Sequence, residues 1–233
     1  MLARTAAPKA LSLALPTDST LGEGYYDKSA IVRPADGASN FALYRLASIA
    51  GVGSAIILLV NAAKRSGLIP TTDLTQLLAP LAEILALGLI IGLFLAAGRR
   101  SGLFGTIAFV INFAALASLE GVEVVINLVF SKLPMATVTE LLAGPLGLVL
   151  LVSSVFFLIG SVMFVISLII GKEVPCIPLA LYLIGAVPIA LRAFVPELVL
   201  DLGLAVLAVG IAWLAGWLWM RASTIRASST RNI

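Results

Sequence analysis

Long apolar runs, separated by short polar breaks, follow one another from residue 41 to residue 220 of the chain. Each run has about the 20 residues that a helix needs to cross the hydrocarbon core of a bilayer. The breaks are rich in Gly, Pro, Ser and charged residues, which is typical of helix ends. The pattern therefore predicts six transmembrane helices, over 41–63, 74–97, 103–130, 138–170, 177–195 and 198–220.

The runs lack the apolar/polar alternation of a membrane β-barrel, so the predicted fold class is all-α: a polytopic membrane protein built as a six-helix transmembrane bundle. The third and fourth runs are longer than a bilayer requires, and we expect these two helices to tilt or to protrude. The fifth run is short and contains Pro178 and Pro188, which makes it the helix in which we expect a kink.

A weak internal repeat accompanies the pattern. Ile69-Pro70, followed by Thr75, recurs as Leu133-Pro134, followed by Thr139, at the same spacing. If the repeat is real, the protein consists of three helical hairpins. The alternative is convergent capping, because proline is favoured at the start of any helix.

The two ends of the chain differ in composition from this core. Residues 1–40 are rich in Pro, Gly, Ser, Thr, Asp and Ala, so they predict a largely irregular tail outside the membrane. Residues 222–233 form a second, short tail. The apolar patch at 10–15 is shorter than the core of a signal peptide, and we expect no cleaved signal.

Composition excludes several classes of protein. The chain has 61% hydrophobic and 12% charged residues, which rules out a soluble globular enzyme and a disordered chain. It contains no histidine and one cysteine, Cys176, which excludes the usual zinc and haem sites, Ser-His hydrolases and a disulfide within the chain. With no nucleotide-binding motif either, we expect no cofactor, no metal and no enzymatic activity.

The basic residues are scattered, which argues against nucleic-acid binding and makes them a topology signal. Of the fifteen Lys and Arg residues, only Lys64, Arg65, Lys132 and Arg192 lie in or near the loops on one side. The loops and tails of the other side carry Arg4, Lys9, Lys28, Arg33, Arg45, Arg99, Arg100, Lys172, Arg221, Arg226 and Arg231. By the positive-inside rule both termini are cytoplasmic, and the Ala, Leu, Val and Gly bias favours a bacterial plasma membrane.

Polar residues within the runs are the only candidates for a site, because ionisable groups at membrane depth are costly. The third run contains Asn112, Glu120, Glu123 and Asn127, which fall within an arc of about 80° on a helix. They form a polar stripe on an otherwise apolar helix. The alternative is that this helix ends near Ser118 and leaves the last three exposed at the interface.

Topology places further polar groups at the same outer level: Glu83 of the second run, and Arg192, Glu197 and Asp201 around the start of the sixth. Glu197 and Asp201 also have a simpler explanation, since a helix N-terminus favours negative charge. We predict a solvated vestibule in which Arg192 is the one buried cation and pairs with Glu120, Glu123 or Asp201. A carboxylate left without a cation could carry a proton. The candidate polar or ion site consists of Glu83, Asn112, Glu120, Glu123, Asn127, Arg192 and Asp201.

Two functions fit these features. The first is an integral scaffold or accessory subunit, whose partners are the lipid bilayer and another membrane protein or a second copy of the chain. Ala208, Ala212 and Gly216 are spaced by four and could form a seam between copies. The alternative is a small transporter or channel-like protein for a proton, a cation or a small polar solute. An enzyme acting on lipid ranks last, because no nucleophile motif is present.

Overall fold

The computed structural model describes residues 35–230, without the side chains of 35–39, 98, 99 and 225–230, and every regular element in this range is a helix. Predictions for residues 1–34 and 231–233 lie outside the described residues. Five helices are long and apolar enough to cross a membrane, which indicates a membrane-embedded, multi-pass protein. They are α1 (Ala35–Arg65), α2 (Asp73–Ala97), α3 (Gly102–Val124) with its continuation, α5 (Pro145–Gly171) and α7 (Glu197–Thr230).

The sixth apolar helix, α6 (Cys176–Ala190), has 15 residues and is shorter than the other five. The run 177–195 was predicted to be one helix to its end, and this is wrong: the backbone leaves the helix at Ala190, two residues after Pro188, and turns through 191–194. Pro188 weakens the last turns of α6, because it lacks the N–H that would bond to residue 184 and its ring crowds that carbonyl group.

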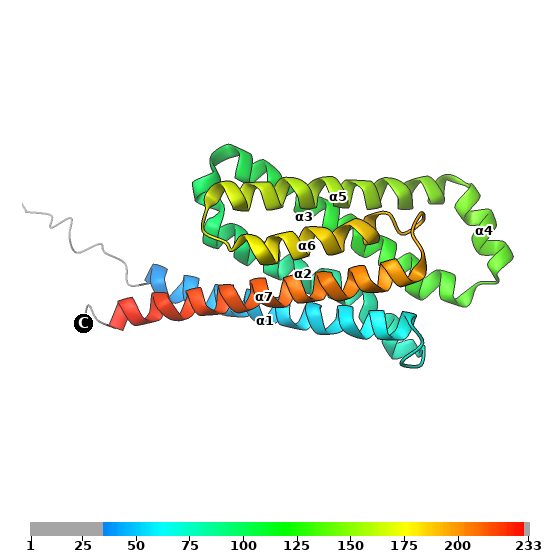
Figure 1. Cartoon of the computed structure of the whole chain (residues 1–233), viewed down its shortest axis with the longest axis horizontal. Coiled ribbons are helices and arrows are strands. Elements are labelled where there is room, and N and C mark those ends of the chain that lie inside the picture. The colour runs from blue at the N-terminus through cyan, green and yellow to red at the C-terminus, as the bar shows by residue number, and fades with distance from the viewer. Residues whose placement is uncertain (1–34, 231–233) are drawn as a thin grey trace, which may run out of the picture. The chain divides into compact units, whose positions relative to one another are not determined.

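The apolar helices close into a ring. Going around it, α1 packs against α2, α2 against α3, α3 against α5, α5 against α6, α6 against α7, and α7 against α1 again. The contact between α1 and α7 is the most extensive, and the two helices lie side by side along much of their length (Figure 1). The first and last helices of the described chain therefore close the ring.

Small residues set the close approach of these helices. A Cβ at Gly92 of α2 would lie 2.4 Å from Cβ of Ala47 of α1, and a Cβ at Gly185 of α6 would lie 2.4 Å from the backbone N of Leu207 of α7. Such approach is how apolar helices gain packing energy in lipid, where no hydrophobic force drives them together. The predicted small-residue seam on α7 is divided: Ala208 is buried, whereas Ala212 and Gly216 are exposed.

The fourth predicted helix, 138–170, is wrong as a single element. The structure has a short helix α4 (Met135–Ala143), an extended residue at Gly144, and then α5 from Pro145. Proline pushes the residue before it out of the helical region and is itself well suited to the first helical position. The apolar run continues across this joint, so hydropathy alone does not reveal it.

Two further boundaries differ from the prediction. α1 begins at Ala35, inside the region predicted to be irregular, and α7 continues to Thr230, through most of the predicted C-terminal tail. At about 1.5 Å per residue α7 is roughly 51 Å long, which exceeds the thickness of a bilayer with its headgroups. The residues at its end extend the helix beyond the apolar part.

The third helix does not end near Ser118. It stays α-helical to Val124, widens into a π-helix over Val125–Val129, and finishes as a 3₁₀ turn over Phe130–Lys132. The Phe130 N–H donates to the Val125 carbonyl oxygen, five residues back, as in a π-helix. Asn112, Glu123 and Asn127 of the polar stripe are therefore buried in the bundle and do not lie on an exposed extension.

Candidate functional site

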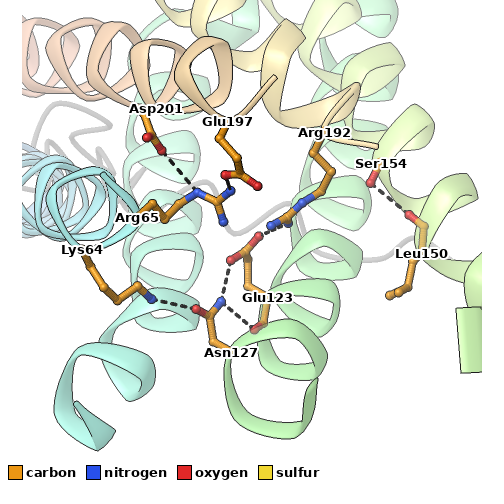
Figure 2. A network of polar contacts seen from close by, with 9 residues as sticks. All are labelled: Lys64, Arg65, Glu123, Asn127, Leu150, Ser154, Arg192, Glu197 and Asp201. Carbon is orange, nitrogen blue, oxygen red and sulfur yellow. Dashed lines mark hydrogen bonds and ion pairs between the residues drawn. The ribbon is translucent and has the colours of Figure 1, made fainter. Parts of the chain in front are cut away.

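Charged and amide side chains from several helices meet at one end of the bundle, which we call the Arg65 end. Figure 2 shows most of them pointing toward one another between α1, α3 and the start of α7. The contacts form two groups, Lys64, Gln76, Asn127, Glu123 and Arg192 in one and Arg65, Glu197 and Asp201 in the other, and we call the two together the charged network.

The centre of this network is Glu123 of α3. Its Oε1 forms an ion pair with Arg192, which lies in the turn after α6, and its Oε2 accepts a hydrogen bond of 2.8 Å from Asn127 Nδ2. The side chains of Glu123 and Arg192 are 8% and 18% exposed. Of the three partners predicted for Arg192, the structure selects Glu123. This pair ties α3 to the α6–α7 connection.

Asn127 has a second role, which follows from the π-helix. Its Nδ2 also donates to the backbone carbonyl oxygen of Glu123 at 3.0 Å, where the hydrogen-bond pattern of the helix changes. Its Oδ1 accepts from Lys64 Nζ of α1 at 2.8 Å, and the same ammonium donates to Gln76 Oε1 of α2 at 2.9 Å. Lys64 thereby links α1, α2 and α3.

Arg65, the next residue along α1, faces α7. It pairs with Glu197 and, through Nε at 3.3 Å, with Asp201. Asp201 is half-buried, and Glu197 is mostly exposed. Glu197 and Asp201 also occupy the first turns of α7, where the helix dipole favours negative charge. The favourable helix dipole at the start of α7 and the ion pairs with Arg65 are therefore compatible explanations for these two carboxylates.

The prediction of one buried cation surrounded by carboxylates is wrong. Three cations, Lys64, Arg65 and Arg192, share the network, and each one contacts a carboxylate or amide oxygen of another segment. Desolvating a charge is costly unless it is paired and hydrogen-bonded. Lys64 and Arg192 meet this requirement, whereas Arg65 Nε and Asp201 Oδ1 form an ion pair without a hydrogen bond. A further pair, Lys132 with Asp73, lies at the exposed rim and links α3 to α2.

Glu83 of α2 lies deeper, near the axis of the ring. It borders a small void of about 10 Å³ that Glu123 and Arg192 also line, and a central void of about 20 Å³. Residues of α1, α2, α3, α5, α6 and α7 all line the central void, including Ser54 and Tyr182. Glu83 Oε2 is buried and accepts no hydrogen bond from the described residues. Each void has about the volume that one water molecule needs.

Two of the predicted residues lie apart from the network. Asn112 is fully buried on α3 in the middle of the bundle, where its Oδ1 accepts a hydrogen bond of 3.4 Å from Ser161 of α5. Ser161 also lies 3.5 Å from the Tyr182 hydroxyl of α6. Glu120 is half-buried and forms no hydrogen bond or ion pair with another described residue. The structure thus joins Glu123, Asn127 and Arg192, brings Asp201 and Glu83 near them, and separates Asn112 and Glu120.

Sequence reasoning missed Lys64 and Arg65, which it treated as loop charges that mark topology. One signal was present: Lys64 lies three residues after Asn61, and Asn61 and Asn127 precede the prolines of the weak repeat, Pro70 and Pro134, by nine and seven residues. The repeat pointed to the same level of the bundle for both. It did not reveal that the lysine folds inward instead of toward water.

A second cluster of charges occupies the opposite end. Glu173, after α5, pairs with Arg100 Nε at 2.8 Å and with Arg221 of α7. The guanidinium of Arg45 stacks on the rings of Trp219 and Phe41, with its carbon 4.1 and 4.8 Å from their centroids. Ion pairs therefore link the helices at both ends of the bundle, and the helices pack through apolar side chains between these ends.

The chemistry that this arrangement supports is electrostatic rather than nucleophilic. Among residues 35–230, as far as their side chains are described, no group of three His, Cys, Asp or Glu side chains could hold a metal ion. Comparison of the chain with protein-family models, with curated proteins and with solved structures gives no significant match.

Proposed function

We propose that the protein is a non-enzymatic scaffold or accessory subunit of a bacterial plasma membrane, with six spans and with the ends of α1 and α7 that lie opposite Arg65 facing the cytoplasm. The observation that carries this proposal is the closed character of the charged network. Its cations contact acceptors on other segments, and the two voids that border Glu83 on the axis of the ring have each about the volume of one water molecule. Such a network fixes the register of helices rather than conducting a solute.

The orientation is supported by the distribution of basic residues between the two ends of the described bundle. The Arg65 end carries four of them, Lys64, Arg65, Lys132 and Arg192. Within residues 35–230 the opposite end carries six: Arg45, Arg99, Arg100, Lys172, Arg221 and Arg226. The positive-inside rule then favours the Arg65 end outside.

Transport of a proton is the second candidate, and one observation favours it. Glu83 combines a buried carboxyl oxygen without a hydrogen-bond donor with a position between the two voids, one of which reaches Arg192 and the other Tyr182. A carboxyl group in such a place is the usual carrier in proton relays. Between the level of Asn112 and the Glu173 cluster the buried polar side chains include Ser48 and Ser167, but no buried carboxylate or amine lies there among the described residues, which is why transport takes second place.

The two functions are separated by reconstitution. Purified protein is inserted into liposomes that contain a pH-sensitive dye, and a proton gradient is imposed. The scaffold proposal expects the same decay of the gradient as in empty liposomes. Decay that depends on the protein, and that Glu83→Gln abolishes while Glu120→Gln leaves it intact, would establish the alternative instead.

A scaffold must also have something to support. Deleting the gene is expected to lower the amount of a membrane protein that co-purifies with the tagged chain from native membranes at fixed stoichiometry. Re-expression of the chain should restore it, whereas the Glu123→Ala variant, with the network broken, should restore less. If no membrane protein co-purifies and none is depleted, the scaffold proposal fails.

A further inference from the structure

A cavity lies beside the charged network and takes no part in the proposed function. It has a volume of about 350 Å³, which is within the range of small-molecule binding sites. Val122 of α3, with Ile126 and Phe130 of its continuation, forms one wall, and Leu150 and Leu151 of α5 form another. Arg65 and Arg192 line its polar side.

The cavity exists because the first part of α5 stands away from the ring. From Pro145 to Val155, Ser154 is the one buried residue, and the exposed side chains include Leu148 at 64% and Val152 at 57%. α4, which precedes this part, packs mainly against α5 and lies at the end of the bundle (Figure 1). This stretch of α5 is thus an apolar wall that faces lipid on one side and the cavity on the other.

The polar side of the cavity presents two guanidinium groups, whose partners Glu123 and Asp201 do not line it. Arg65 and Arg192 line it together with one carboxylate, that of Glu197, whose side chain is 79% exposed. Figure 2 shows the two guanidinium groups on either side of Glu197. A guanidinium has five N–H donors, and Arg192 uses a single nitrogen, NH1, for its ion pair with Glu123. Donors therefore remain for an anionic group, and phosphate suits their geometry.

The level of the cavity in the membrane identifies the kind of ligand. Leu150 to Ser154 lie about 8 to 14 Å from the start of α5 at Pro145. α5 is about 40 Å long, close to the thickness of a bilayer with its headgroups, so these residues are at the level of the glycerol and the upper acyl chains. A ligand that reaches this cavity through lipid brings an apolar chain to the α3 and α5 walls and an anion to the arginines.

We propose that this cavity is a binding site for an anionic phospholipid, with the phosphate on Arg192 and Arg65 and an upper acyl segment between α3 and α5. Basic pockets between transmembrane helices bind anionic headgroups in this way. The site does not depend on the scaffold proposal, because lipid can be bound whether or not the protein has a partner or conducts protons.

The test compares phosphatidylglycerol with phosphatidylcholine of the same acyl chains on the purified full chain, by native mass spectrometry. Ala193 lines the cavity, whereas the adjacent and exposed Phe194 does not, so Ala193→Trp and Phe194→Trp form a matched pair. Wild type and Phe194→Trp should retain phosphatidylglycerol in preference to phosphatidylcholine, and Ala193→Trp should bind it about tenfold more weakly. Equal retention of the two lipids by wild type, or equal loss in both variants, would overturn the proposal.

A second measurement needs no variant. Phosphatidylglycerol with a photoactivatable diazirine in the upper part of one acyl chain is cross-linked to wild-type protein, and the labelled peptides are sequenced. Labels within 122–130 or 147–154 are expected, because these segments form the two walls. Labels confined to the opposite end, around Arg45 and Trp219, would show that the lipid preference belongs to other arginines and would refute the site.

Discussion

The contribution of the Glu123–Arg192 pair to stability can be estimated from its burial. Both side chains are largely buried, at 8% and 18% exposure, so Glu123→Gln leaves a guanidinium that has little water to replace the lost carboxylate. Removing one partner of a buried pair costs about 3 to 5 kcal/mol. Glutamine keeps the volume and can still accept from Asn127, so we expect the lower end, about 3 kcal/mol.

The assay is unfolding by SDS in mixed micelles, which gives a free energy of unfolding for each variant. A double-mutant cycle of Glu123→Gln with Arg192→Gln isolates the pair, and we expect a coupling energy of about 2 kcal/mol. Replacing both residues, as Glu123→Leu with Arg192→Met, should be close to neutral, because no charge is then left buried without a partner. Asp73→Asn, in the exposed pair with Lys132, is the control and should have no measurable effect. A loss below about 1 kcal/mol for Glu123→Gln, or no coupling, would refute the argument from burial.

Three further predictions follow from the same structure. Lys64→Met should lower the free energy of unfolding by about 1 to 2 kcal/mol, because Gln76 and Asn127 lose their donor, and more than Lys132→Met does; equal effects would show that Lys64 is not held by these amides. Gly92→Ala should cost about 1 to 3 kcal/mol in the same assay, since its Cβ meets Ala47, whereas Gly216→Ala, with nothing within 4 Å, should not destabilise; a neutral Gly92→Ala would mean that α1 and α2 are not in close contact. In intact cells a membrane-impermeant maleimide should label the double variant Ser66→Cys, Cys176→Ser, and it should not label the wild-type chain, in which the exposed Cys176 is the one cysteine; the reverse pattern would invert the proposed orientation.

Hydropathy located the long helices because lipid imposes a simple requirement, a run of apolar residues of sufficient length. Hydropathy did not locate the helix breaks that lie within an apolar run. The joint at Gly144 and Pro145 interrupts no apolar run, and the end of α6 at Ala190 falls within one. Both breaks depend on backbone chemistry at proline. Helix ends beyond the bilayer, at Ala35 and Thr230, have no apolar signal at all.

Helical periodicity predicted which face of a helix carries the polar residues, but not their level along the helix axis. Helical periodicity places Asn112 and Glu123 on nearly the same face, yet 11 residues separate them by about 16 Å along the axis, so they belong to different layers. Glu123 and Arg192 were found because topology gave their level independently of their angle. Lys64 and Arg65 were missed because long basic side chains at a helix end usually reach toward water, and only the partners on α3 and α7 turn them inward.

The pairing of Arg65 with the start of α7 has a consequence for biogenesis. Glu197 follows Arg65 by 132 residues, a segment whose synthesis takes about 7 to 26 s at 5 to 20 residues per second. During that time α1 has been synthesised, whereas Glu197 and Asp201, the partners of Arg65, have not. The ion pairs between Arg65 and the start of α7 can therefore form only after translation has reached α7, late in the synthesis of the chain.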